Sequence, residues 1–322
     1  MFEMEIASNI NKLVKELTSK TYKLGKYKIF KIYDPKERLI EALPYKDRVV
    51  LMCFCKKVIE PKLENRLIYD NAASRKKKGS DFAINRLHGF MRKFYINTGG
   101  NNFFFLKCDI SKYFQSIDHD ILIAKLRKCG FSEDEMWFME MVIRASRSGD
   151  ARGVPLGNQT SQWFALLYLD DMDRLIKEKL HVACYVRYMD DFILLGENKE
   201  FLRKCKTEIE NFCAEKLRLT LNAKTQIGMV KNGIDFLGYN HKLTATGKIT
   251  KSIRASARER QKRYLKAIAY YYMAGVIDDD YIASRQASFL AHAAGTKDKK
   301  FLNNKLNSLK RAKRLTENGL SH

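Results

Sequence analysis

Three aspartates stand where the sequence predicts that strands end. Asp190 and Asp191 lie in YMDD, which interrupts the apolar run of residues 185–195, and Asp109 closes the apolar run FFFLKCD. Transfer of a nucleotidyl group from a triphosphate uses two divalent cations held by carboxylates from separate elements. If the two runs form neighbouring strands of one sheet, the three carboxylates meet there and form a site for two cations. Taken alone, two aspartates in a turn are ordinary turn residues, so only the combination indicates chemistry.

The elements that must position these aspartates are strands alternating with helices. Residues 103–108 are expected to form a strand, and the amphipathic pattern of residues 117–130 predicts a helix soon after it. A further helix is predicted after Gly157, where Thr160 or Ser161 could accept the first backbone N–H groups as a cap. The YMDD sequence then forms the tip of a hairpin. We therefore expect a mixed α/β protein whose sheet carries the aspartates.

Turn signals and changes in composition divide the 322 residues into three expected lobes, and a hydrophobic content of 45% is enough for a substantial core. The first lobe comprises residues 1–101, with 119–150 contributing, and contains a hairpin pattern in KYKIFKIYDPKERLIEALP. The second comprises residues 102–240. The third, residues 241–322, is expected to be basic and helical.

The charge of the chain predicts a polyanionic partner. The formal net charge is +23, and residues 241–322 alone contain 18 Lys and Arg against 6 Asp and Glu. Four of these cations recur every four residues, which would place them on one helical face: Arg254, Arg258, Lys262 and Lys266. They would repel one another unless a phosphate backbone lay beside them, although a solvated charged face is an equal alternative.

Composition also restricts the cellular setting. The seven cysteines contain no CxxC pair and no histidine spacing typical of a zinc site, which favours reduced thiols. The N-terminus lacks the apolar core of a signal peptide, and no apolar run is long enough to span a bilayer. We therefore expect a cytoplasmic protein with no membrane partner.

Five motifs occur in an order and at separations that resemble those of a reverse transcriptase. They are DISKYF, PLGNQTSQ, YMDD, LNAKTQI and FLGY, and with DPKERLI and KDRVV near the N-terminus they extend over nearly the whole chain. The resemblance implies a right-hand polymerase fold, with helical fingers, a palm built on an antiparallel sheet, and a helical thumb. It also implies an RNA-directed DNA polymerase that uses an RNA template, a DNA or RNA primer and deoxynucleoside triphosphates.

The resemblance assigns the metal site to DISKYF and YMDD. Asp109 and Asp190 would be the principal ligands, Asp191 a weaker one, and the backbone carbonyl of Ile110 would complete the set. The implied cofactor is a pair of Mg²⁺ ions, with Mn²⁺ able to replace them.

Further roles follow from the same resemblance. Phe114 would exclude a ribose 2′-OH, and Lys224 would be a cation or proton donor near the triphosphate; the alternatives are a core aromatic and a solvated lysine. The residues implied for the incoming nucleotide are Lys36, Arg38, Phe114, Leu156, Gly157 and Gln162. Those implied for primer and template are Tyr188, Met189, Phe236, Leu237, Gly238, Tyr239, Arg254, Arg258, Lys262 and Lys266. Weaker candidates for phosphate contacts are Arg48, Arg75 and Lys78.

The motif PLGNQTSQ departs from the common form of the family at two positions. Leu156 replaces a glutamine before Gly157, and Gln162 replaces a proline. Both departures resemble the reverse transcriptases of bacterial and phage diversity-generating retroelements. That resemblance implies mutagenic retrohoming, in which a template-repeat RNA is copied into cDNA with errors at adenines, and a small basic accessory protein as partner. The alternatives are a retron, group II intron-like or phage-defence reverse transcriptase, and a catalytically silent nucleic-acid-binding scaffold.

Overall fold

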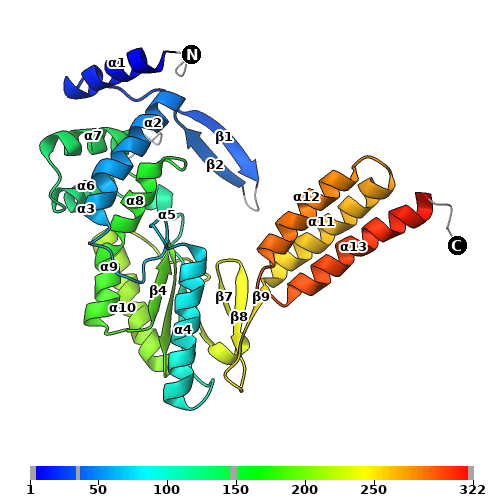
Figure 1. Ribbon diagram of the computed structural model, residues 1–322. Helices are drawn as coiled ribbons and strands as arrows, with labels where there is room; N and C mark the ends of the chain where they lie inside the picture. Colours follow the sequence, from blue (N-terminus) through cyan, green and yellow to red (C-terminus); the bar gives the residue numbers. More distant parts are fainter. Residues whose placement is uncertain (1–4, 34–36, 146–150, 318–322) are drawn as a thin grey trace. The chain divides into compact units, whose positions relative to one another are not determined.

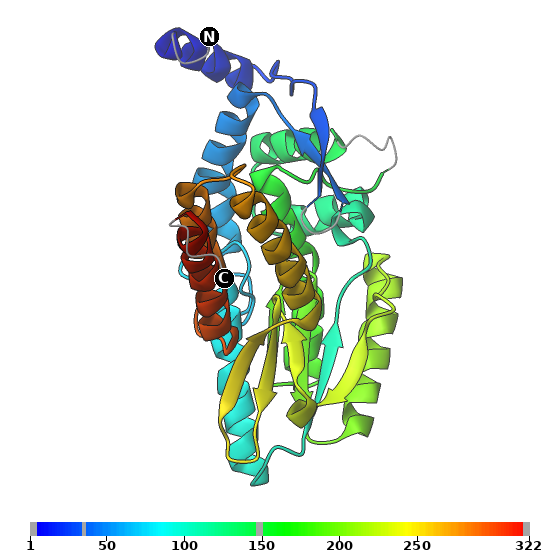
Figure 2. The ribbon, with the colours of Figure 1, turned by 90° about the vertical axis from the view of Figure 1, so that its right-hand side faces the viewer.

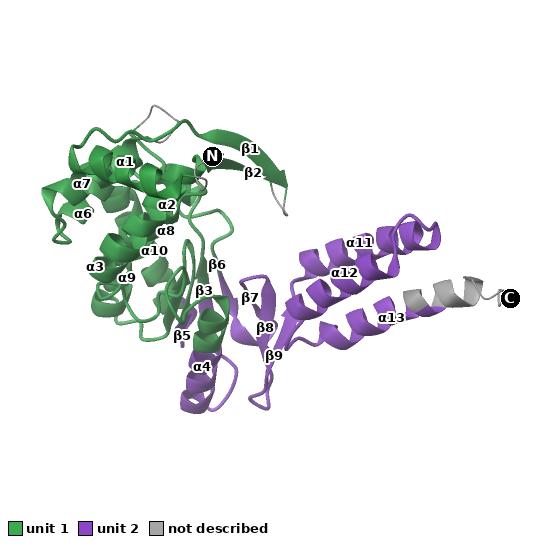
Figure 3. Cartoon of the chain, turned by 45° about the horizontal axis from the view of Figure 1, so that its top comes forward, with its two compact units in different colours: residues 1–87, 106–194, 200–226 green, residues 88–105, 195–199, 227–322 purple. Residues whose placement is uncertain are grey.

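A computed structural model describes residues 5–33, 37–145 and 151–317, and the chain forms two compact units (Figure 3). Unit 1 is made up of residues 1–87, 106–194 and 200–226, and unit 2 of residues 88–105, 195–199 and 227–322. Because each unit draws on several stretches of sequence, the two units do not follow the order of the chain. The division into three lobes stays a prediction.

Over the described residues the strands form three sheets, and every strand pair whose register is known is antiparallel (Figure 1). The first pairs β1 (Lys28–Tyr33) with β2 (Glu37–Ala42), which confirms the predicted N-terminal hairpin. The second has the order β4-β5-β3-β6, with β4 (Tyr185–Tyr188), β5 (Asp191–Gly196), β3 (Phe104–Cys108) and β6 (Gln226–Met229). The third has the order β7-β8-β9, with β7 (Ile234–Phe236), β8 (Tyr239–Leu243) and β9 (Ile249–Ile253).

Helices make up most of unit 1. In chain order these are α1 (Ile6–Thr18), α2 (Tyr45–Phe54), α3 (Glu60–Leu63), α5 (Tyr113–Ser116), α6 (His119–Arg127), α7 (Glu133–Arg144), α8 (Gln159–Tyr168), α9 (Asp170–Arg174) and α10 (Lys199–Leu217). Two π-helical turns, Cys55–Ile59 and Leu175–Lys179, follow α2 and α9, and α4 (Ser80–Thr98) passes from unit 1 into unit 2. The predicted helix after the first aspartate is confirmed as α6, which Asp118 caps by accepting the N–H groups of Asp120 and Ile121.

Helix α8 is buried over most of its length. Its residues from Trp163 to Tyr168 are all buried, as expected for a helix that is apolar on every side. The expected cap at Thr160 or Ser161 is wrong, because α8 begins earlier and Asn158 is its N-terminal flanking residue. Asn158 donates its side-chain N–H to the Tyr27 hydroxyl at 2.9 Å, so it ties the helix start to the segment before β1.

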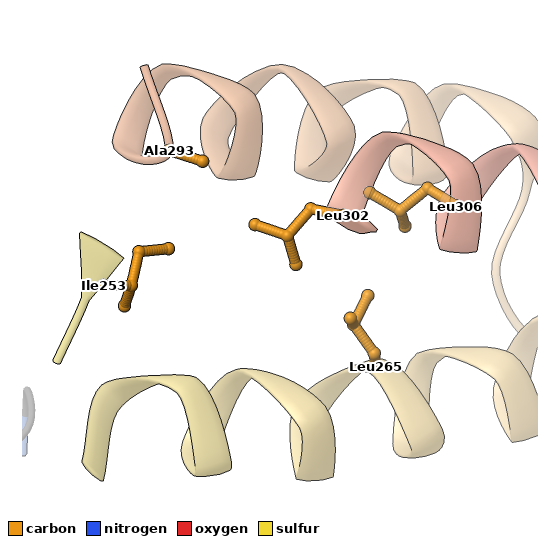
Figure 4. Packing of buried hydrophobic residues seen from close by; sticks show 5 residues of the cluster. All are labelled: Ile253, Leu265, Ala293, Leu302 and Leu306. Carbon is orange, nitrogen blue, oxygen red and sulfur yellow. The ribbon is translucent and has the colours of Figure 1, made fainter. Parts of the chain in front are cut away.

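In unit 2 a small sheet is followed by a helical bundle. Figure 2 shows β7, β8 and β9, in yellow, running into α11 (Ala255–Met273), which is followed by α12 (Asp279–His292) and α13 (Asp298–Glu317). Their shared core, drawn in Figure 4, is formed by Ile253, Leu265, Ala293, Leu302 and Leu306. From Ala255 to Glu317 the chain consists of these three helices and their connections, whereas β8 and β9 occupy most of residues 241–253. The assignment of residues 241–322 to a third lobe stays a prediction.

Two findings concern the expectations about thiols and membranes. None of the seven cysteines, all of which are described, forms a disulfide. Over the described ranges, every helix is too short or too polar to cross a lipid bilayer.

Candidate active site

The YMDD sequence forms a tight hairpin turn in unit 1. Strands β4 and β5 pair antiparallel with Tyr188 opposite Asp191, so Met189 and Asp190 alone make the turn. Met189 has a φ of +55°, a left-handed backbone conformation that is uncommon for a residue with a side chain. Because β5 neighbours β3 in the sheet, the turn lies next to the end of β3, which Asp109 follows. The predicted neighbouring strands are confirmed.

The structure brings two of the three aspartates into direct contact. The carboxyl groups of Asp190 and Asp109 lie close enough to interact, and this interaction raises the pKa of Asp190. The pKa of Asp190 is raised to about 7, first by burial and then by the negative charges of Asp109 and Asp191. Two carboxyl groups held together in a half-buried site repel each other when both are ionised, and a divalent cation would relieve that repulsion.

Asp191 is held differently. Its Oδ2 lies 3.4 Å from the Nζ of Lys107 on β3, and both side chains are largely buried. Lys107 therefore balances part of the negative charge beside the carboxylate pair. Among the described residues no group of three or more Asp, Glu, His or Cys side chains is arranged as a metal site. The hard oxygen donors of Asp109 and Asp190 fit Mg²⁺ as a pair, whereas the part of Asp191 stays a prediction.

Asn222 anchors Asp109, and the sequence interpretation missed it. Its backbone N–H donates to the Asp109 carbonyl at 2.7 Å, and its side-chain Nδ2 donates to Asp109 Oδ2 at 3.2 Å. Next to this contact, Ile110 and Leu221 form an antiparallel bridge, which places the Ile110 backbone beside the chain that follows α10. Asn222 lies in LNAKTQI, two residues before Lys224, so the motif itself could have indicated it. Lys224 is exposed.

The loop of PLGNQTSQ lies against the N-terminal hairpin. Glu41 of β2 donates its backbone N–H to the Leu156 carbonyl at 3.0 Å. Gly157 has a φ of +130°, and a Cβ atom there would stand 2.8 Å from the Glu41 carbonyl oxygen. The loop is tied to DISKYF as well, because Val154 donates its N–H to the Phe114 carbonyl at 2.9 Å. Two elements from distant parts of the sequence thus hold this loop.

A cavity of about 290 Å³ opens beside this loop. Its lining residues are Leu39, Glu41, Gln115, Arg152, Gly153, Val154 and Leu156. Leu156 is half-buried and contributes an apolar wall. Gln162, the other unusual residue of the motif, is not among these lining residues, and its side-chain oxygen accepts a hydrogen bond from the Ser74 hydroxyl at 3.3 Å.

The basic residues of unit 1 that were predicted to bind phosphate are of two kinds: some are exposed, and others form hydrogen bonds within the protein. Lys36 lies outside the described residues, and Arg38 is exposed on β2 opposite Ile32. Arg48 is exposed as well, and its guanidinium lies 5.7 Å from the centre of the Tyr45 ring. These positions leave Arg38 and Arg48 accessible to a phosphate in solution.

Arg75 and Lys78 are used within the protein. The Arg75 guanidinium donates to both carboxylate oxygens of Glu64, at 2.9 and 3.1 Å, and also to backbone carbonyls. Lys78 Nζ donates to the Tyr69 carbonyl at 2.5 Å and lies over the rings of Tyr69 and Phe82. The pKa of Lys78 is lowered to about 8, first by burial and then by the positive charge of Arg75. Both residues therefore have structural partners that a phosphate would have to displace.

In unit 2, FLGY forms the turn between β7 and β8. Leu237 and Gly238 both have positive φ values, +48° and +88°, which shape this two-residue turn. The turn is supported from within the unit, because His241 places Nε2 3.3 Å from the Phe236 carbonyl and Nδ1 2.9 Å from Nε2 of His88.

Three of the four cations predicted to face a phosphate backbone are paired inside unit 2. Arg254 lies 3.6 Å from Asp235, Arg258 lies 3.0 Å from Asp298, and Lys262 lies 2.9 Å from Glu259. Lys266 is exposed on α11. Arg254 flanks the N-terminus of α11 and is not part of it, so the predicted face begins one residue before the helix.

Comparisons with known proteins agree with this fold. The family model described as reverse transcriptase (RNA-dependent DNA polymerase) matches residues 35–241. A curated relative, the putative COX1/OXI3 intron 2 protein of Saccharomyces cerevisiae, is 24% identical over 44% of this chain and 24% of its own length.

Solved structures share the fold at low sequence identity. Telomerase from Candida albicans, in complex with the TWJ fragment of telomeric RNA, has a TM-score of 0.55 and 16% identity, over 80% of this chain and 54% of that one. Apo telomerase from Candida tropicalis has a TM-score of 0.56 and 15% identity, over 71% and 48%. The chain thus spans about half the length of these structures and about a quarter of the curated relative.

The chain has a mixed α/β, polymerase-like fold with antiparallel sheets and packed helices. Because the family model covers well over half of the residues, the chain belongs to the reverse transcriptase family.

Proposed function

We propose that the protein is an RNA-directed DNA polymerase whose reaction centre is the pair Asp109 and Asp190. The observation that carries this proposal is the contact between the two carboxyl groups at the ends of neighbouring strands, in a member of the reverse transcriptase family. The reaction is attack of a primer 3′-OH on the α-phosphate of a deoxynucleoside triphosphate. RNA template, primer and nucleotide are the proposed substrates, and the net charge of +23 favours such polyanions.

Asp109 and Asp190 would hold Mg²⁺, with Asp191 and the Ile110 carbonyl as further ligands. When bound, the two ions lower the pKa of the 3′-OH and stabilise the charge on the departing pyrophosphate. Asn222 orients the Asp109 carboxylate by donating to its Oδ2. Lys107 offsets part of the negative charge at Asp191. Phe114 is proposed to exclude a ribose 2′-OH, and Lys224 to donate a proton to pyrophosphate.

The remaining site residues keep the roles predicted from the resemblance. Arg38, with Lys36, would bind the triphosphate, since a guanidinium fork donates to two phosphate oxygens at once. Tyr188 and Met189 would lie near the primer terminus. The turn from Phe236 to Tyr239 would hold the growing strand. In this proposal residues 1–101 and 119–150 act as fingers, 102–240 as palm and 241–322 as thumb.

Primer extension on an RNA template tests the reaction centre. We expect Asp190→Asn to reduce single-nucleotide incorporation in Mg²⁺ by at least about 10²-fold, because it removes a charge that holds the ions while keeping the side-chain shape. The matched control is Asp171→Asn, which removes an exposed carboxylate paired with Lys125 elsewhere in unit 1. Incorporation that survives Asp190→Asn at the control level would refute the assigned centre.

We further propose that the enzyme belongs to a diversity-generating retroelement and copies template-repeat RNA with errors at adenines. Leu156 and Gln162 support this class, since both depart from the common motif. Leu156 lines the cavity beside β2, and its side chain can neither donate nor accept a hydrogen bond there. A templating base beside Leu156 would be held less firmly than beside a glutamine. A small basic accessory protein is part of this proposal.

Sequencing of cDNA made by Leu156→Gln tests that role. We expect fewer misincorporations opposite template adenine and an unchanged error frequency opposite the other three bases. Leu156→Met is the control, because it keeps an apolar side chain of similar volume. An adenine error frequency that is the same in all three proteins would contradict the proposed role.

An intron-type reverse transcriptase is the second candidate. The identity shared with the yeast intron 2 protein favours it. The same cDNA sequencing separates the two candidates, because wild-type cDNA that is as accurate at adenines as at other template bases would favour the second.

A further inference from the structure

One arginine next to the YMDD turn is completely buried. Arg187, the residue before Tyr188 in β4, has 0% of its side chain exposed, as does its ion-pair partner Asp173 on α9. Burying a guanidinium and a carboxylate removes the hydration of two charges, so such a pair persists only where its hydrogen bonds are well satisfied. The sequence offers no reason for a charged residue at this position, since its neighbours in β4 are core residues.

The partners of Arg187 satisfy its guanidinium almost completely. Nε and Nη2 donate to the two oxygens of Asp173, at 2.7 and 2.6 Å, in a bidentate pair. Asp173 also accepts the hydroxyl of Tyr185 at 2.6 Å, which fixes the carboxylate. Nη2 donates in addition to the carbonyl of Leu166 on α8 at 3.1 Å. The guanidinium therefore has one possible orientation, set by α8, α9 and β4 together.

The last hydrogen bond of Arg187 reaches the turn itself. Nη1 donates to the carbonyl of Met189 at 3.0 Å. That carbonyl and the N–H of Asp190 belong to one planar peptide group, so fixing the oxygen fixes the plane from which the Asp190 side chain projects. Met189 is in the left-handed conformation, which persists only where the surroundings impose it. The hydrogen bond from Arg187 to the Met189 carbonyl is one contact that holds Met189 in this conformation.

The backbone of Arg187 adds a fourth connection. Its N–H donates to the Asp70 carbonyl at 3.0 Å, and its own carbonyl accepts the N–H of Ala72 at 2.9 Å. The segment from Asp70 to Ala72 thus extends the sheet beyond β4, through the parallel bridge between Asn71 and Arg187. Apart from its contact with the turn, Arg187 is therefore held through both its backbone and its side chain.

We propose that Arg187, oriented by Asp173, is a positioning residue that sets the Met189–Asp190 peptide and thereby the distance between the Asp190 and Asp109 carboxylates. This inference rests on the proposed polymerase function. Arg187 does not touch a reacting atom, and it acts through the turn. A purely structural ion pair would contribute to folding and leave the chemistry of each folded molecule unchanged, and this difference is measurable.

The test compares wild type with Arg187→Lys, which keeps the buried positive charge beside Asp173 but offers no planar fork to reach Met189 at the same time. Single-turnover primer extension gives the burst amplitude, which counts active molecules, and the incorporation rate of each active molecule. We expect that rate to fall about tenfold or more, because small displacements of reacting groups cost large factors in rate. Mn²⁺ affinity, measured by electron paramagnetic resonance without nucleic acid, should weaken in parallel, toward that of Asp190→Asn.

A second variant covers the case in which lysine disturbs folding. Arg187→Met combined with Asp173→Leu and Tyr185→Phe replaces the buried polar cluster by apolar side chains of similar size, a change that proteins often tolerate. This variant should melt cooperatively and show the same loss of incorporation rate and Mn²⁺ affinity. Arg174→Lys is the matched control, because Arg174 pairs with Asp170 and donates to the Arg66 carbonyl without contacting the turn.

The outcomes separate the two proposals. Suppose that the wild type incorporates nucleotides. If Arg187→Lys or the apolar variant then has the same incorporation rate per active molecule and the same Mn²⁺ affinity as the wild type, the role of Arg187 is overturned. A lower burst amplitude at an unchanged rate would also overturn it, since that result describes a folding role alone. Absence of incorporation by the wild type on any primed RNA would refute the proposed function. The Mn²⁺ affinities of the wild type and the Arg187 variants would still test whether Arg187 positions the turn.

Discussion

Adding one methyl group at Gly157 should separate the PLGNQTSQ loop from strand β2. The backbone of Gly157 has a φ of +130°, a conformation that side-chain-bearing residues rarely adopt. A Cβ atom would also stand 2.8 Å from the Glu41 carbonyl oxygen, closer than real Cβ atoms come to a backbone atom. Gly157→Ala therefore forces either the loop or the hairpin to move.

The expected cost has two parts. A residue held in a sparsely populated backbone region costs about 1–3 kcal/mol. Movement of the loop also stretches the hydrogen bond from the Glu41 N–H to the Leu156 carbonyl, now 3.0 Å, which contributes about 0.5–1.5 kcal/mol. We expect Gly157→Ala to lower the free energy of unfolding of unit 1 by the sum of these two parts, about 1.5–4.5 kcal/mol. Because Leu156 lines the adjoining cavity, the Kd for deoxynucleotides should rise as well.

Urea denaturation followed by tryptophan fluorescence measures this cost in the correct unit, since both tryptophans of the chain, Trp137 and Trp163, lie in unit 1. The control is Gly130→Ala. Gly130 also has a positive φ, +73°, but a Cβ there meets no atom within 4 Å, so the change should cost only about 1–2 kcal/mol. If Gly157→Ala costs no more than Gly130→Ala, the close approach to Glu41 does not constrain the loop and the reasoning is refuted.

Three further predictions concern the site and the turn of unit 2. Asn222→Ala should lower the rate of single-turnover primer extension and raise the Mg²⁺ concentration required, because Asp109 loses the donor to its Oδ2; an unchanged Mg²⁺ dependence would argue against this role. Arg38→Ala should raise the Kd for the incoming nucleotide by about tenfold or more, as expected for a charge-assisted phosphate contact, while filter binding shows unchanged affinity for primed RNA. Burial lowers the pKa of both His88 and His241 to about 4, from an ordinary value of 6.5. The unfolded chain therefore binds more protons below pH 6.5, and unit 2 should lose stability as the pH falls from about 6.5 to 4. Hydrogen exchange in the β7–β8 hairpin should report this loss, and a pH dependence that is no flatter in His241→Gln would contradict it.

The elements with a strong local pattern were predictable from the sequence. The apolar run before Asp109 is a strand, the pattern after it is helix α6, and the N-terminal hairpin has the expected antiparallel pairing. Each of these depends on periodicity or turn chemistry within a short window, which local sequence records directly. The cap of α8 was mispredicted, because Thr160 and Ser161 look like caps in sequence although the helix starts before them.

The basic side chains were harder to interpret. Sequence composition presented Arg75 and Lys78 as candidates for phosphate contacts, but Glu64 and the backbone already engage the first, and two aromatic rings surround the second. A cation on the surface and a cation used inside the fold have the same letter in the sequence. Burial and distant partners distinguish them, and neither is a local property.

By itself the sequence determined the chemistry available to this protein: aspartates that end strands, a tight YMDD turn between apolar strands, and an excess of positive charge. Tertiary structure decided how these groups are arranged. It joined Asp190 to Asp109, turned Asp191 toward Lys107, and placed Asn222 behind Asp109. It also buried Arg187 against Asp173, 14 residues earlier in the chain. Such contacts join residues that no sequence period connects, and a buried charge is stable only where folding has already assembled its partners.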